Sequence, residues 1–201
     1  MILVITDSLG LPRMKPEEVK IQDTYPQLLR TKFGYDTYHQ GQGFATVAVI
    51  RSYLNYFNID DYDKIILQFG IVDCAPRPLT RYEYFILRNI KLNKGLDFFM
   101  RKYRNIKKTK LHIFERYCID IKELCRDKLL VLPIVYASSD YEEELPNIGN
   151  NVNRYNEILK SIFGKHLVDL ELEEEHFMTD QHHFSKIGHK KIASILNSKV
   201  P

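Results

Sequence analysis

The strongest indication of the fold is the N-terminal stretch, Met1-Ile2-Leu3-Val4-Ile5-Thr6-Asp7-Ser8-Leu9-Gly10. Its four consecutive apolar residues, 2–5, are typical of a buried parallel strand, and the polar residues after them mark the turn that ends it. Ser8 lies at that turn. Because open parallel sheets bind their ligands at the carboxyl ends of the strands, a serine at this position is a candidate for chemistry.

The rest of the chain alternates strand-like and helix-like segments. Contiguous apolar residues predict further strands at 35–38, 63–69, 128–135 and 166–169, with helices between them. This alternation predicts an α/β fold, a three-layer α/β/α sandwich of flavodoxin-like type around a parallel sheet of about five strands. Residues 76–126 are mostly helical and about twice as long as a simple crossover. We therefore expect a single domain, 1–201, with a long helical insertion at 76–126.

The composition excludes several classes of protein. Apolar residues make up 44% and charged residues 27% of the 201 residues, which argues against a disordered chain. The longest apolar runs are strand-sized and no charged-then-apolar leader precedes the first strand, so we expect no membrane span and a cytoplasmic location. Three cysteines without metal-finger spacing argue against a structural zinc site or a disulfide framework.

The net charge of +3 is too small to indicate a nucleic-acid partner. Residues 101–110 nevertheless place six basic side chains in ten positions. We interpret this stretch as a solvated helical face. The alternative is a site for an anionic glycan, a lipid headgroup or nucleic acid.

A serine hydroxyl is a weak nucleophile unless a histidine takes its proton and a carboxylate orients that histidine. Asp180 and His183 precede the last predicted helix, and a tight turn over three residues can bring the carboxylate to the imidazole. Other polar or glycine-rich loops follow the second and third predicted strands. They contribute Gly41, Gly43 and Asp73.

Two blocks of the sequence resemble a known family. Residues 5–9 resemble the Gly-Asp-Ser-Leu signature of the SGNH hydrolases (the GDSL esterase and lipase superfamily), with Thr6 in place of the glycine. Residues 180–189 resemble that family's Asp-x-x-His block at the start of the final helix. The resemblance implies that Ser8 is the nucleophile, His183 the base and Asp180 its orienting partner. We expect no cofactor and no bound metal.

The middle blocks match less closely. Gly43, or alternatively Gly41, resembles the glycine whose N–H group joins that of the serine in the oxyanion hole. The family's third block, Gly-x-Asn-Asp, reads Gly70-Ile71-Val72-Asp73 here, so the asparagine donor is replaced by valine. Losing one such donor typically costs on the order of 10²–10³ in rate, which predicts a divergent member.

Several side chains could replace the missing donor. Arg77 is a candidate for this role or for anchoring an anionic substrate, and the other candidates are Gln40, Gln42 and Gln68. We expect Asp73 to lie among the substrate-binding residues. Alternatively, Asp73 has a purely structural role and holds the first loop by hydrogen bonds.

The expected function is a serine-dependent ester hydrolase or O-acyltransferase that forms an acyl-enzyme on a small or carbohydrate-linked ester, such as acetyl on a polysaccharide. The expected partner is this ester substrate, and the sequence does not indicate an oligomeric state. The alternative is a weakly active or inactive module that binds a glycan or protein through residues 76–126.

Two other kinds of site are disfavoured by spacing. A metal site could draw on Asp180 with His176, His182, His183 and His189, but no HExxH-like spacing is present. His182 could also replace His183 as the base, whereas His189 is interpreted as a packed or capping residue. An aspartate nucleophile at Asp7 would require an acid at position 9, which is leucine.

Overall fold

The computed structural model describes residues 1–87, 92–136 and 139–200. Its centre is a parallel sheet of β1 (Ile2–Thr6), β2 (Thr37–Gly41), β3 (Lys64–Gln68) and β4 (Leu129–Leu132), in the order β2-β1-β3-β4. Thr6, the last residue of β1, is level with the last residues of β2 and β3. The predicted α/β sandwich with a parallel sheet is confirmed, and Ser8 follows the central strand at the carboxyl edge.

The expected fifth strand is wrong, since the sheet has four strands within the described ranges. Residues 166–169 approach β4, but they form only one parallel bridge, in which the N–H of Val168 donates to the carbonyl of Val131 at 2.8 Å. The next rung of that ladder would need an N–H at position 133. Pro133 has none, so the pairing stops after one step.

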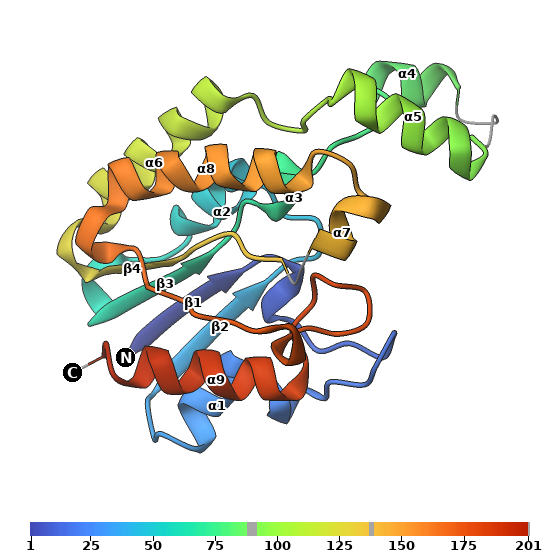
Figure 1. Cartoon of the computed structure of the whole chain (residues 1–201). Coiled ribbons are helices and arrows are strands. Elements are labelled where there is room, and N and C mark those ends of the chain that lie inside the picture. Colours follow the sequence, from blue (N-terminus) through green and yellow to red (C-terminus); the bar gives the residue numbers. More distant parts are fainter. Residues whose placement is uncertain (88–91, 137–138, 201) are drawn as a thin grey trace.

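Helices cover both faces of the sheet (Figure 1). One face carries α1 (Tyr25–Thr31) and α9 (Lys186–Asn197), which pack together, and the other carries α2 (Val47–Leu54), α6 (Leu111–Cys125) and α8 (Ile148–Phe163). Because both faces are covered, residues 2–5 of β1 are all buried, as their unbroken apolar run predicts.

Shorter elements connect these layers. The helices α3 (Ile71–Cys74) and α7 (Ser139–Glu144) follow β3 and β4. The described residues also form six 3₁₀ turns, at Ser8–Gly10 (η1), Ile21–Asp23 (η2), Ile59–Asp61 (η3), Arg126–Lys128 (η4), Gly164–His166 (η5) and Glu174–His176 (η6).

The expected helical insertion contains α4 (Arg81–Ile86) and α5 (Lys94–Arg104), which project from the body of the molecule, followed by α6 against the sheet (Figure 1). Two arginines of the basic stretch 101–110 hold α5 in place. Arg101 pairs with Asp97 of the same helix at 2.5 Å and donates to the carbonyl of Pro76 at 2.6 Å, and Arg104 pairs with Glu83 of α4 at 2.7 Å. In the part of the chain that the structure describes, no helix is long and apolar enough to cross a membrane.

Candidate active site

Ser8 begins η1, directly after β1 and at the carboxyl edge of the sheet. It is half-buried and lines a cavity of about 460 Å³. The same cavity is lined by Gly43, Arg77 and His183, three of the residues that the sequence proposes for the site, and by Val72. Segments from the two ends of the chain thus line the same cavity.

Threonine replaces the family's glycine at position 6 because two glycines make room for it. The hydroxyl of Thr6 hydrogen-bonds with Nε2 of His39 at 3.0 Å. A Cβ at Gly10 would lie 2.5 Å from the Thr6 hydroxyl oxygen. A Cβ at Gly41 would lie 3.0 Å from the same oxygen and 2.5 Å from the side chain of Leu11. Gly41 therefore serves close packing and is not among the residues lining the Ser8 cavity.

Gly43 occupies a different environment. A Cβ at this position would meet no heavy atom within 4 Å, although the residue lines the Ser8 cavity. Unlike Gly41, Gly43 is not required for close packing, and the absence of a side chain here leaves part of the Ser8 cavity open. Of the two glycines considered for the oxyanion hole, Gly43 is the one placed next to the serine.

Asp180 holds His183 through both its ring and its backbone. One carboxylate oxygen lies 2.7 Å from Nδ1 of His183, and the other accepts the His183 backbone N–H at 3.0 Å. Burial opposes ionisation of Asp180, but these hydrogen bonds hold the pKa of the carboxyl well below its ordinary value. The ionised carboxylate favours the tautomer with hydrogen on Nδ1, which leaves the Nε2 lone pair available as a base.

The chain around His183 is anchored on both sides. The carbonyl of His183 accepts the N–H of Met178 at 2.7 Å. Ser185 caps α9, as predicted, and its hydroxyl accepts the N–H of Gly188 at 3.1 Å. The imidazole is consequently carried on a rigid loop, which a general base requires for fixed geometry.

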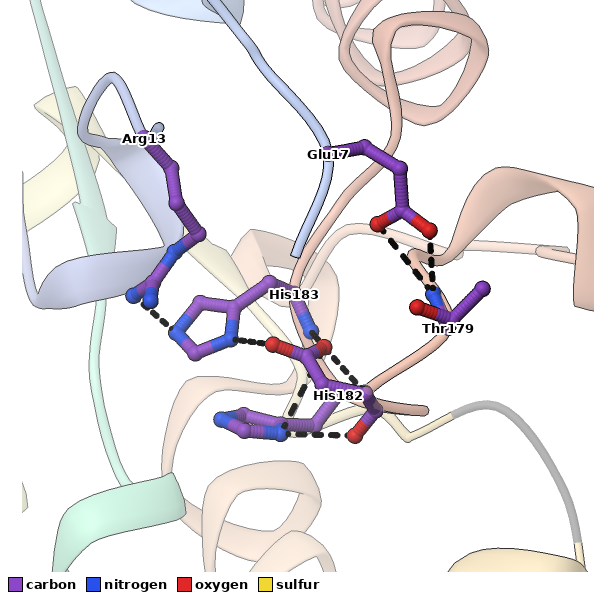
Figure 2. Close-up of polar contacts among 6 residues, drawn as sticks. Arg13, Glu17, Thr179, His182 and His183 are labelled. Carbon is purple, nitrogen blue, oxygen red and sulfur yellow. Dashed lines mark hydrogen bonds and ion pairs between the residues drawn. The ribbon is translucent and has the colours of Figure 1, made fainter. Parts of the chain in front are cut away.

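Arg13 contacts Nε2 of His183 through its guanidinium group (Figure 2). An arginine side chain only donates hydrogen bonds, so Nε2 is the acceptor, in agreement with the tautomer that Asp180 favours. The same nitrogen would have to receive a proton from Ser8. Arg13 must therefore leave Nε2 before His183 can act on the serine.

The loop that carries Arg13 is built to reach this position. Arg13 and Val19 exchange two backbone hydrogen bonds of 2.7 and 2.8 Å, which close the loop into a hairpin. The carboxylate of Glu17 accepts the backbone N–H of Thr179 at 3.2 and 3.3 Å (Figure 2). Sequence reasoning missed Arg13, because it lies 170 residues from His183 and belongs to no recognisable motif.

Among the proposed replacements for the missing asparagine, only Arg77 lines the Ser8 cavity. Its Nη2 donates to the carbonyl of Val72 at 3.5 Å, and its Nε is a buried donor with no partner within residues 1–87, 92–136 and 139–200. Gln40 and Gln42 do not line the cavity, and the buried Gln68 accepts a hydrogen bond from Tyr25 at 2.9 Å. Of these candidates, Arg77 is therefore the one placed where it could donate a hydrogen bond to an oxyanion in the Ser8 cavity.

Asp73 lies under the site rather than in it. It is fully buried and accepts hydrogen bonds from the backbone N–H of Val47, at 2.9 Å, and from the hydroxyl of Thr109. These hydrogen bonds link Asp73 to the start of α2 and to the segment before α6, not to the first loop that the structural alternative names. Burial raises the pKa of its carboxyl to about 6, against the opposing effect of these hydrogen bonds.

Asp7 is a second buried carboxyl beneath the serine. One oxygen accepts the N–H of Leu9 at 2.9 Å, and the other is buried without a hydrogen-bond partner among the described residues. Burial raises the pKa of Asp7 to about 7; the Leu9 hydrogen bond opposes this shift and the negative charge of Asp73 adds to it. Such a carboxyl is more stable protonated than ionised in its environment.

The other three histidines of the loop and helix around His183 have structural partners. His182 stacks on Tyr141 with ring centroids 5.3 Å apart, and Nδ1 of the buried His189 accepts the N–H of Tyr25 at 3.1 Å. His189 is therefore packed, as the sequence suggests. Nδ1 of His176 accepts the N–H of Glu173 at 2.8 Å.

Three side chains of one loop could hold a metal ion. Asp180, His182 and His183 offer ligand atoms within 4.8 Å of one another, and no fourth residue joins them in the described chain. A metal bound at Nδ1 of His183 would displace the hydrogen bond to Asp180. Metal binding there and orientation of the imidazole are therefore mutually exclusive.

Comparison with known proteins identifies the fold. No family model matches the chain, and no curated protein matches it. Among solved structures, a lipase/acylhydrolase from Enterococcus faecalis has a TM-score of 0.66 at 14% identity, covering 99% of this chain and 94% of that one. An acetylxylan esterase from Geobacillus stearothermophilus has a TM-score of 0.63 at 16% identity, with 99% and 93% covered.

A further acetyl xylan esterase matches over 100% of both chains, with a TM-score of 0.63 and 14% identity. These likenesses extend over nearly the whole chain at low sequence identity, so they describe the path of the backbone. The chain has the α/β fold that these lipolytic and acetyl xylan esterases share.

Proposed function

We propose that this chain is a divergent SGNH hydrolase that cleaves carboxylic esters through a Ser8-His183-Asp180 triad. The observation that carries the proposal is that Ser8 shares a cavity with a histidine whose Nδ1 lies 2.7 Å from a carboxylate oxygen. The fold shared with esterases supports it, as does the resemblance of residues 5–9 and 180–189 to the family's motifs.

The chemistry would proceed in two stages. Once Arg13 leaves Nε2, His183 takes the Ser8 proton while the serine oxygen attacks the ester carbonyl, and Asp180 stabilises the imidazolium that forms. The N–H groups of Ser8 and Gly43 would hold the oxyanion, with the Arg77 guanidinium in place of the absent amide. His183 then protonates the departing alcohol, and water repeats the sequence to release the acid.

We further propose a small or carbohydrate-linked acyl ester as substrate, with acetyl as the first choice. Two structurally similar proteins are acetyl xylan esterases, which supports this choice. Transfer of the acyl group to a sugar hydroxyl would use the same residues, with the hydroxyl replacing water. Comparing release of acetate with acetylation of added oligosaccharides separates the two reactions.

The direct test is labelling with a fluorophosphonate, which reacts with activated serines. We expect an adduct at Ser8 that Ser8→Ala and His183→Ala both abolish. Ser194→Ala, which alters an exposed serine of α9, is the matched control and keeps full labelling. A folded protein without an adduct, or with one elsewhere, would contradict the triad.

The alternative, a non-catalytic binding module, is favoured by two observations. Val72 offers no oxyanion donor, and Arg13 occupies the base nitrogen. It predicts that the folded protein binds an acetylated oligosaccharide without labelling or turnover. Calorimetric titration of the unlabelled protein with that oligosaccharide checks this outcome.

A further inference from the structure

A second cavity, of about 800 Å³, lies next to the one that contains Ser8. Phe44 and Arg77 line both cavities, so the two hollows adjoin at these residues. The second cavity is bounded by residues near α2, by the start of α4, and by the segment 106–110 that leads into α6. A molecule with its ester at Ser8 could extend past Arg77 into this space.

Five basic side chains line the second cavity: Arg77, Arg81, Lys107, Lys108 and Lys110. None of the described residues that line it is acidic. Asp73 is the carboxyl behind this wall, where the hydroxyl of Thr109 hydrogen-bonds to it. By contrast, Arg101 and Arg104 of the same basic stretch are paired with carboxylates.

The cations of this cavity oppose one another. Burial and the positive charges of Arg77 and Arg81 lower the pKa of Lys108, with Asp73 opposing the effect. Burial, together with the charge of Arg154 outside the cavity, lowers the pKa of Lys107. Bringing such groups together is unfavourable in the empty protein, whereas a negatively charged ligand between them would relieve the repulsion.

The remaining lining is partly apolar. Leu79 is buried, and Ile106, Ile113 and Tyr117 are half-buried around the same space. A bare inorganic anion would leave this surface uncovered. An anionic group on a carbon chain or ring would use both the charges and the apolar wall.

We infer that the cavity between Arg77 and Lys110 binds the anionic end of an amphipathic ester substrate, a carboxylate or phosphate on an apolar carrier. This inference rests on the proposed function, since it places the ester carbonyl of the same molecule beside Ser8. Arg77, which lines both cavities, would lie between the reacting ester and the anion. The cavity would then select substrates by their charge, and this selection would be independent of the reaction at Ser8.

The kinetic test compares the O-acetyl esters of linear ω-hydroxycarboxylic acids with those of the corresponding ω-hydroxy amides, over a series of chain lengths and with acetate release as the readout. We expect at least one anionic ester to have a KM about tenfold lower than its neutral counterpart, because three to five weak ion pairs act together. Replacing three cations, in Arg81→Gln/Lys107→Gln/Lys108→Gln, should reduce this preference to below about twofold. The kcat for the neutral ester should stay unchanged.

A matched control removes the same charge from another surface. Lys190→Gln/Lys191→Gln/Lys199→Gln replaces three exposed lysines that do not line the cavity, and should retain the preference. Equal KM values for the charged and neutral esters at every chain length would overturn the inference. So would a preference that the first triple variant retains.

A binding test separates this inference from the proposed catalysis. Octyl phosphate is titrated calorimetrically into Ser8→Ala, and octyl glucoside serves as the neutral probe of the same chain length. We expect the phosphate to bind more tightly, with a Kd that rises about tenfold when the three cations are also replaced. If the Kd for octyl phosphate is the same with and without the three substitutions, the inference of an anion-binding site is wrong, even if the protein hydrolyses esters. Cation-dependent binding in a protein that labels at no serine and hydrolyses no ester overturns only the proposed function.

Discussion

The buried carboxyl of Asp7 predicts a large effect of pH on stability. Its side chain is fully buried, and one oxygen has no hydrogen-bond partner in the part of the chain that the structure describes. Its pKa is raised from 3.8 to about 7. The difference of about 3 pKa units corresponds to about 4 kcal/mol, at about 1.4 kcal/mol per unit. This is the free-energy cost of ionising Asp7 in the folded protein rather than in the unfolded chain.

The sign follows from proton binding. Between about pH 4 and pH 7 the folded protein holds the Asp7 proton while the unfolded chain releases it, so stability falls as pH rises through this window. An asparagine at this position would still accept the Leu9 N–H and would carry no titrating group. We therefore expect Asp7→Asn to gain stability relative to wild type by about 4 kcal/mol on going from pH 4 to pH 8.

The assay is urea unfolding followed by circular dichroism, for both proteins at half-unit pH steps. Taking the difference between variant and wild type cancels titrations that both share, such as that of the buried His189. Asp169→Asn, at an exposed carboxylate, controls for loss of one negative charge. A difference that stays constant from pH 4 to pH 8 would refute the reasoning that Asp7 is protonated when buried.

Four further substitutions probe the site. Gly43→Ala should fold normally but raise KM, because its methyl group enters the Ser8 cavity. Gly41→Ala should lower the free energy of unfolding by about 1–3 kcal/mol through overpacking. Steady-state kinetics and urea unfolding distinguish the two variants, and reversed effects would contradict the roles given to the two glycines. Arg13→Gln should raise kcat/KM for a neutral aryl acetate several-fold, since it frees the base nitrogen, and a fall would instead give Arg13 a positive role in turnover. Val72→Asn should raise kcat about tenfold or more if the amide reaches the oxyanion, and an unchanged kcat would show that it does not.

Local patterns in the sequence predict most of the fold. The unbroken apolar run of β1 indicates a strand buried on both faces, and Ser185 indicates the start of α9. Both signals depend on neighbouring residues alone, through side-chain alternation and helix capping. The same reasoning is wrong at 166–169, where an apolar segment meets Pro133 of a distant strand and loses the N–H that a ladder requires.

By itself, the sequence determined where Ser8 follows a strand and that Asp180 stands three residues before His183, because both depend on short stretches of chain. Only the tertiary structure decided that Arg13 contacts the His183 ring, and that Arg77 joins the serine cavity to a basic one. These contacts join loops far apart in sequence, and their geometry depends on how the sheet brings the loops together at its carboxyl edge. Strand and capping patterns carry no information about which side chain meets which across that edge.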